Sequence, residues 1–192
     1  MPEIVHGLPK GFEPDAAALY WQAFGKKLGK LMGPGPRAEG FFADSLNHDA
    51  MLAAMEGDRL LGIAAFKSGE HGFSSSGMSG LFRHYGLGAL WRLIPLAMLE
   101  RKAPEGILQM DGICVAAEAR GKGVGTALLN ALFEYASTHG FTGVTLDVID
   151  TNPRARALYE NLGFEATGVE QTSILRPLLG FATATRMVRQ LA

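Results

Sequence analysis

A glycine-rich turn is the part of the chain best suited to bind a negatively charged group. It consists of Arg120, Gly121, Lys122, Gly123, Val124, Gly125 and Thr126. Its three alternate glycines let the backbone bend sharply and bring N–H groups close to a ligand without interference from a Cβ atom. The turn precedes an apolar helical pattern, and unpaired N–H groups of a first helical turn favour phosphate. The pattern therefore predicts a phosphate site, with a plain strand-to-helix turn and two solvated cations as the alternative.

Two other phosphate-binding patterns do not fit this turn. A P-loop needs Gly-Lys followed by Ser or Thr, and here Lys122 is followed by Gly123. A dinucleotide-binding turn needs a glycine where Thr126 stands. Asp147, at the end of a later strand pattern, could still bind a ribose. A nucleotide-dependent oxidoreductase therefore stays as a minor alternative.

The elements around the turn follow from hydrophobic periodicity. The run at 107–115 predicts a strand that leads into the turn, and apolar residues over 124–136 predict the helix after it, with Gly140 as its stop. A strand is expected over 144–148, and Asn152 and Pro153 are typical of the start of another helix. Further strands are expected over 164–169 and 181–191.

The first half has fewer signals. It predicts a strand at 4–8, a helix over 17–31 that ends at the prolines and glycines of 33–36, and a short helix through Phe41 and Leu46. A hairpin is expected from strands at 50–55 and 60–66. The apolar stretch 87–99, too short to span a bilayer, is interpreted as a buried or groove-lining segment. Together the elements predict one mixed α/β domain.

Three segments, taken in order, resemble the two best-known motifs of the GCN5-related N-acetyltransferase (GNAT) family. They are Ile113-Cys114-Val115, the turn 120–125 and the segment Asn152 to Phe164. The resemblance implies a mainly antiparallel sheet flanked by helices, in a single domain over residues 1–192. Residues 1–105 would then be a variable acceptor-side half, and residues 106–192 the acetyl-CoA-binding half.

The resemblance also implies roles for individual residues. Acetyl-CoA would lie between the strands that end near Val115 and Val148, its pantetheine arm paired to the backbone of 113–115 and its pyrophosphate on 120–126. Asn152 and Ala155 would line the other side, and Tyr159 would reach the sulfur. The acetyl group would pass directly to a bound amine on a small molecule or a peptide.

Transfer to an amine needs a base and an acid, because an ammonium must lose a proton and a thiolate must gain one. Tyr159 is predicted as the acid, although a tyrosine on the inner face of a helix is ordinarily packed core. Asp111 is the leading base, because it interrupts an apolar strand. Four residues of the first half are alternatives, namely Glu39, Asp44, Glu70 and His84. Cys114 has no neighbouring histidine to activate it and is interpreted as a small buried residue.

The acceptor is expected among aromatic residues of the first half, at least half of which should instead pack in the core. These residues are Trp21, Phe24, Phe82, Tyr85 and Trp91. A second hypothesis is a non-catalytic acyl-CoA-binding or regulatory module, which would keep the phosphate site without turnover.

Composition limits the partners. A net charge of -1 gives no overall field for nucleic acid or an anionic membrane, so neither is expected as a partner. The single Cys114 excludes an internal disulfide and favours a reducing, cytoplasmic compartment. The five histidines are scattered, so no metal is expected. A homodimer stays open.

Overall fold

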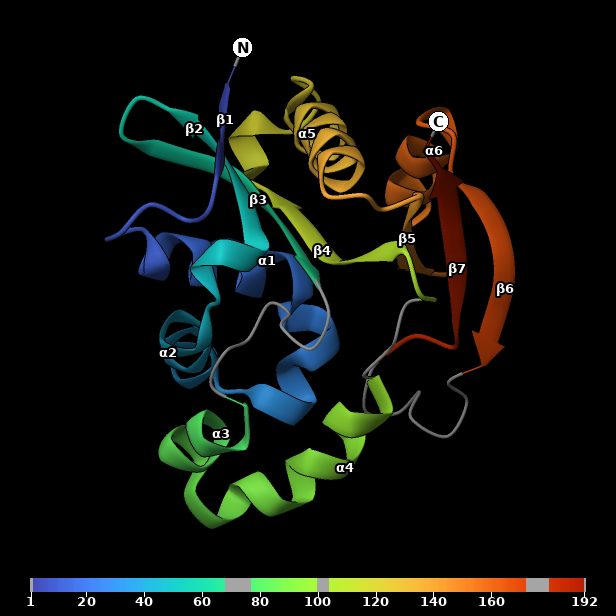
Figure 1. Cartoon of the computed structure of the whole chain (residues 1–192). Helices are drawn as coiled ribbons and strands as arrows, with labels where there is room; N and C mark the ends of the chain where they lie inside the picture. Colours follow the sequence, from blue (N-terminus) through green and yellow to red (C-terminus); the bar gives the residue numbers. More distant parts are fainter. Residues whose placement is uncertain (1, 68–76, 100–103, 172–179, 192) are drawn as a thin grey trace.

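The computed structural model describes residues 2–67, 77–99, 104–171 and 180–191. Its centre is one seven-stranded sheet with the strand order β1-β2-β3-β4-β5-β7-β6 (Figure 1). The strands are β1 (Glu3–His6), β2 (Met51–Glu56), β3 (Arg59–Lys67), β4 (Ile107–Val115), β5 (Gly143–Ile149), β6 (Glu165–Gln171) and β7 (Thr183–Gln190). Neighbouring strands are antiparallel except β4 and β5, which are parallel. The sheet runs without interruption through both halves of the chain, and the mixed, mainly antiparallel fold class predicted from the sequence is confirmed.

Helices cover both faces of the sheet. They are α1 (Glu13–Met32), α2 (Gly35–Ser45), α3 (Gly77–Tyr85), α4 (Ala89–Leu99), α5 (Val124–Thr138) and α6 (Pro153–Asn161). In Figure 1, α1 and α2 lie below the sheet and α5 lies above it. Most predicted elements are confirmed to within a few residues, because apolar periodicity marks the buried side of each element.

Two cores form because alternate residues of each strand point to opposite faces. Ala64, Leu108 and Met110 pack with Leu128 and other residues of α5 on one face. On the opposite face, Ile63 and Cys114 pack with residues of α1 and α2. The sheet is therefore buried on both sides at β3 and β4, and any opening at β4 must pass between the two cores.

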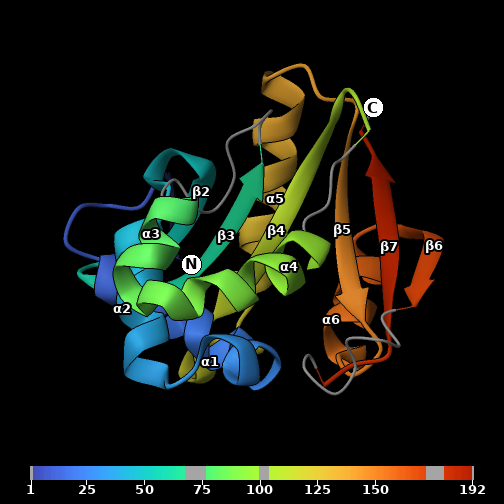
Figure 2. The same cartoon turned by 90° about the horizontal axis from the view of Figure 1, so that it is seen from below.

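The ladder between β4 and β5 is short. Its register contains Ile107–Gln109 against Gly143–Thr145, and beyond these residues the two strands pair with different neighbours. Gly143 suits the closed end, because a Cβ there would lie 2.9 Å from both the Arg189 oxygen and Ile107 Cδ1. Figure 2 shows β4 and β5 as the two arms of a V.

A bulge in β4 accompanies this parting. Ala65 of β3 pairs with Gly112, but the next residue, Phe66, pairs with Met110. Asp111 is therefore the extra residue, and a bulge of this kind bends and twists its strand. The same irregularity that turns β4 away from β5 thus places a carboxylate at the point of divergence.

The interpretation of residues 87–99 as a buried or groove-lining segment is wrong in its buried form for four of the apolar side chains that the structure describes there, namely Leu87, Leu90, Trp91 and Ile94. Ala89 is buried and Leu93 and Leu96 pack against the α1–α2 core, but Leu87 is 85% and Ile94 71% exposed. The segment forms α4, and a single helix presents only one stripe to its neighbours. Apolar residues on its other faces are left on the surface.

A glycine in β3 tests how tightly the strands next to the opening are packed. A Cβ at Gly62 would lie 2.7 Å from the Cys114 carbonyl oxygen and 3.2 Å from Leu128 Cδ1. Gly62→Ala should therefore lower the free energy of unfolding by about 1–3 kcal/mol, since backbone must move to make room. Chemical denaturation measures this. Gly168→Ala in β6 is the matched control, because a Cβ there has nothing within 4 Å; equal losses in both variants would contradict the packing argument.

Candidate active site

A cleft of about 250 Å³ opens where β4 and β5 part. It is lined from one side by residues of α1 and from the other by residues of α6. The lining residues are Ala23, Phe24, Lys67, Gln109, Met110, Asp111, Gly112, Ile113, Asp147, Val148, Ile149, Asn152, Ala155 and Tyr159. Residues from both faces of the sheet therefore line the cleft.

One edge of β4 borders this cleft. After Gln109, β4 continues its ladder with β3, while β5 continues with β7. The edge of β4 that faces β5 at Ile113 therefore lies where an extended ligand can pair with a strand.

Tyr159 is held in place by the start of α6. Asn152 caps the helix, with its Oδ1 accepting from the Ala155 N–H at 3.2 Å. The Tyr159 side chain is buried, lines the cleft and packs edge-on against Phe164 at 5.8 Å between ring centres. Burial, and then the neighbouring Cys114 thiol, raise the pKa of Tyr159 above the ordinary value of 10.0. At neutral pH this phenol keeps its proton and is a donor.

A second tyrosine lies near the bulge. Burial raises the pKa of Tyr20, and the neighbouring Cys114 and Asp111 raise it further. Cys114, 3% exposed, thus lies close to both phenols, in agreement with its interpretation as a small buried residue. The sequence pattern placed Tyr20 on the apolar face of a helix, and nothing in that pattern separated it from the core aromatics beside it.

The glycine turn has the backbone that a phosphate site requires. Gly121 and Gly123 have positive φ angles of 78° and 82°, and Gly123 is the N-cap of α5. The Ala127 N–H donates to the Gly123 carbonyl oxygen at 2.9 Å. Within the described backbone, it is the first N–H of α5 that donates to another residue. The N–H groups of Val124–Thr126 are left for a ligand, so the residues present fit a pyrophosphate.

The turn is packed directly onto the end of β4. A Cβ at Gly125 would lie 3.4 Å from Leu158 Cδ2 and 3.9 Å from Val115 Cγ2. The Arg120 Nε donates to the Val115 oxygen at 3.0 Å, and Lys122 is exposed. The phosphate site therefore continues from the edge of β4 without a break.

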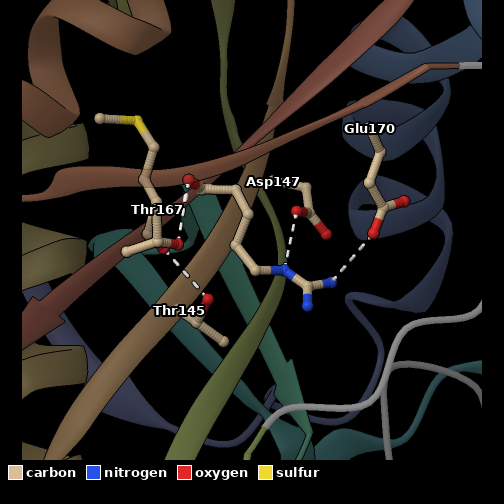
Figure 3. A network of polar contacts seen from close by, with 6 residues as sticks. Thr145, Asp147, Thr167 and Glu170 are labelled. Carbon is tan, nitrogen blue, oxygen red and sulfur yellow. Dashed lines mark hydrogen bonds and ion pairs between the residues drawn. The ribbon is translucent and has the colours of Figure 1, made fainter.

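Asp147 lines the cleft but already has a cationic partner. The Arg186 side chain lies between two carboxylates that Figure 3 labels, with its Nε 3.4 Å from Asp147 Oδ1 and its Nη2 3.9 Å from Glu170 Oε1. Thr167 donates to the Arg186 carbonyl oxygen at 3.4 Å. Asp147 therefore lines the cleft as one member of an ion pair with Arg186.

The structure brings together part of the predicted site. Asp111, Ile113, Asn152, Ala155 and Tyr159 all line the cleft. Cys114 is buried beside them, and Val115 lies at the junction with the glycine turn. Sequence reasoning missed the lining residues Ala23, Lys67, Gln109 and Ile149, because nothing in their local patterns indicates an opening.

Of the five aromatic residues expected at the acceptor, Phe24 lines the cleft. The other four do not line this cleft. Trp21 and Tyr85 pack in the α1–α2 core, where the Tyr85 hydroxyl donates to the Met32 oxygen at 2.6 Å. Phe82 and Trp91 are 40% and 49% exposed.

Three of the alternative bases, Glu39, Asp44 and His84, do not line the cleft. His84 Nε2 lies 3.0 Å from Asp44 Oδ2 in an ion pair between α3 and α2, and Glu39 is also on α2. Glu70 lies outside the described residues. Asp111 thus keeps the best position among the predicted bases.

No cluster of three or more His, Cys, Asp or Glu residues in the described ranges could hold a metal ion. No helix within them is long and apolar enough to cross a membrane.

A mixed sheet that opens between two parallel strands, with a glycine turn and a helix N-terminus beside the opening, defines the fold class of GNAT-like acyltransferases. The model of the acetyltransferase (GNAT) family matches residues 15–164, and the chain belongs to this family. The family model therefore also matches most of residues 1–105, which the sequence motifs did not cover.

Individual relatives agree with this assignment. Rat N-acetyltransferase family 8 member 2 is 31% identical over 91 residues, which are 46% of this chain and 40% of that relative's length. The N-acetyltransferase of Staphylococcus aureus Mu50 superposes with a TM-score of 0.66 at 18% identity, covering 97% of this chain and 99% of the other. A Bacillus anthracis Ames structure, described as a streptothricin acetyltransferase in complex with acetyl coenzyme A, gives a TM-score of 0.51 at 16% identity, covering 74% and 62%. At these identities the two structures establish the fold.

The raised pKa of Tyr159 predicts how stability depends on alkaline pH. Above pH 10 the unfolded chain gives up this phenolic proton while the folded protein retains it, so folding becomes less favourable as the pH rises. Tyr159→Phe removes this contribution. The variant should lose less stability than the wild type between about pH 9 and 11, as urea unfolding at a series of pH values would show. Parallel losses in both proteins would mean that the phenol titrates normally.

Proposed function

We propose that this protein is an N-acetyltransferase that moves an acetyl group from acetyl-CoA directly to an amine, with Tyr159 as general acid. One observation carries the proposal: a buried phenol with a raised pKa faces the opening between β4 and β5, and an anion site follows at the end of β4. A binding site for a thioester would thus lie next to a binding site for a pyrophosphate.

The donor would be held largely by backbone. We assign its pantetheine arm to the β4 edge at Ile113–Val115 and its pyrophosphate to the turn 120–126, with Asn152 and Ala155 on the other side. The structural relative from Bacillus anthracis that was solved with acetyl-CoA supports this choice of donor. Residues 106–192 would then hold the donor, and residues 1–105 would close the acceptor side.

The chain's own residues would manage two protons. Asp111, at the bulge, takes one from the ammonium, which frees a lone pair for attack on the thioester carbon. A C–N bond forms and the C–S bond breaks, and the acylated nitrogen gives its second surplus proton to solvent, which leaves a neutral amide. The Tyr159 hydroxyl gives its proton to the departing sulfur, and solvent later restores both residues to their starting state.

A direct assay separates this proposal from a non-catalytic acyl-CoA-binding module. The acceptor panel contains n-butylamine, spermidine, Nα-acetyllysine amide and an alanyl peptide. Release of free CoA, with the acetylated amine identified by mass spectrometry, supports the enzyme. Tight binding of acetyl-CoA in calorimetry with no product from any amine would favour the module.

Replacing Tyr159 with Phe keeps the ring and removes the proton donor. The rate should fall by roughly 10²-fold or more while acetyl-CoA binds within a few-fold of the wild type, since the lost hydroxyl acts in the transition state. Steady-state kinetics and calorimetry give the two quantities. Tyr135→Phe is the control, because Tyr135 is partly buried on α5 and does not line the cleft. A wild-type rate in Tyr159→Phe would leave Tyr159 as a packing residue.

Gly123→Val tests the anion site separately. A side chain there would strain a backbone with φ of 82° and would project toward the bound pyrophosphate. Affinity for acetyl-CoA should fall at least tenfold, a loss that calorimetry can measure.

Gly140→Val is a matched control at the other end of α5. Gly140 also has a positive φ, 78°, and a Cβ at either glycine meets nothing within 4 Å. Both variants should therefore lose similar thermal stability, but Gly140→Val should keep its affinity for acetyl-CoA. Equal affinities of the two variants for acetyl-CoA would contradict the assignment of the pyrophosphate to the turn.

A further inference from the structure

The outer side of α4 carries a stripe of exposed apolar side chains. Leu87, just before the helix, is 85% exposed, and Leu90, Trp91 and Ile94 are 56%, 49% and 71% exposed. Their i, i+3, i+4 and i+7 spacing places these four residues, the α4 stripe, on one side of a helix. Figure 2 shows α3 and α4 in front of the sheet, on the outside of the molecule. An apolar surface of this kind marks a place where another molecule binds.

The orientation of α4 is fixed by Arg92. Its Nε donates to the Leu31 carbonyl oxygen at the end of α1, at 2.7 Å. Its guanidinium carbon lies 4.3 Å from the ring centres of both Tyr85 and Trp91. The opposite side of α4 packs against the α1–α2 core. The helix therefore cannot turn its exposed stripe inward, and only another molecule can cover it.

Positive charge is concentrated around the α4 stripe. The segments 26–37 and 77–99 meet where Arg92 binds Leu31, and they contain six Lys and Arg residues and neither Asp nor Glu. Without these six of the 18 basic residues, the rest of the chain has 12 basic against 19 acidic residues. The carboxylate of Asp44 on the adjacent α2 is engaged by His84 at 3.0 Å. The six cations are Lys26, Lys27, Lys30, Arg37, Arg83 and Arg92.

This combination favours an anionic lipid surface over a protein partner. Leu87 and Ile94 protrude too far to lie in a groove of the described structure, and grooves are what peptides and helices usually bind. A second copy, docked stripe to stripe, would bring two cationic ends together, which disfavours association. A bilayer interface accepts a protruding apolar helix face, and its lipid phosphates attract the surrounding cations.

We propose that the α4 stripe docks this protein on the surface of an anionic lipid bilayer, with α4 parallel to the membrane. Leu87, Leu90 and Ile94 enter the boundary between headgroups and acyl chains, and Trp91 lies at headgroup level. With 11 residues, α4 is about half the length needed to span a bilayer, so it lies in the interface. The uneven distribution of charge provides the attraction that a whole-chain charge of -1 does not predict.

Cosedimentation of the full chain with lipid vesicles tests the proposal. The protein should bind phosphatidylglycerol vesicles roughly tenfold or more tighter than phosphatidylcholine vesicles, and added salt should weaken this binding. Tryptophan fluorescence should shift to the blue on phosphatidylglycerol vesicles as Trp91 leaves water. The shift should be absent in Trp91→Phe, because Trp21 packs against the α1–α2 core.

Two pairs of variants separate the apolar contribution from the charge. Leu87→Ser combined with Ile94→Ser should keep the melting temperature, since both side chains are exposed, and should lower vesicle affinity roughly tenfold or more. Val169→Ser, at a 63% exposed position on β6, is the control and should bind like the wild type. Arg83→Glu should weaken binding to phosphatidylglycerol at least roughly fivefold. Lys10→Glu makes the same charge change at an exposed position before α1 and should have little effect.

Three results would overturn the proposal. The first is a wild type that does not bind phosphatidylglycerol vesicles. The second is vesicle affinity that falls equally in the stripe variant and in Val169→Ser. The third is a wild-type dimer in sedimentation velocity that the stripe variant dissociates while neither protein binds vesicles, which would assign the stripe to a second copy. The vesicle assay needs no acetyl-CoA, and the stripe does not line the cleft, so its outcome is independent of the proposed acetyl transfer.

Discussion

The early end of the ladder between β4 and β5 is the constraint on which the rest of the structure depends. Two parallel strands normally pair along their length, but here the register stops at Gln109 and Thr145. The bulge at Asp111 turns β4 toward β3, and β5 continues with β7. An edge of β4 thereby borders a cleft inside a sheet that is covered on both faces.

The position of the opening separates two chemical environments. On the α5 side, a helix N-terminus and the glycines of the turn offer N–H groups, which suit an anion. On the α1 side, the Asp111 carboxylate suits a group that donates hydrogen bonds. A chain with a net charge of -1 needs no overall field for this, because the complementary groups act at short range.

Burial determines which phenols of the site stay protonated. Tyr159 is buried and Tyr20 is partly buried, and burial, followed by the neighbouring Cys114 thiol, raises the pKa of each phenol. The Asp111 carboxylate at the bulge lies near Tyr20 as well. Donors that hold their protons thus lie beside an acceptor, an arrangement that suits transfer between a thioester and an amine. The ion pair between Asp147 and Arg186 keeps a second carboxylate of the cleft engaged.

The sequence by itself determined the elements and one side of the site. Periodicity fixed most strands and helices, and the turn 120–126 and the helix start at Asn152 carry local signals, because turn and capping geometry depend on neighbouring residues. The family was likewise readable from these motifs. Tertiary structure alone decided which aromatic residue reaches the cleft, and that α4 exposes apolar side chains. These features depend on contacts between residues far apart in the chain, such as Phe24 with Gly112, and a local pattern cannot report which distant surface a side chain will meet.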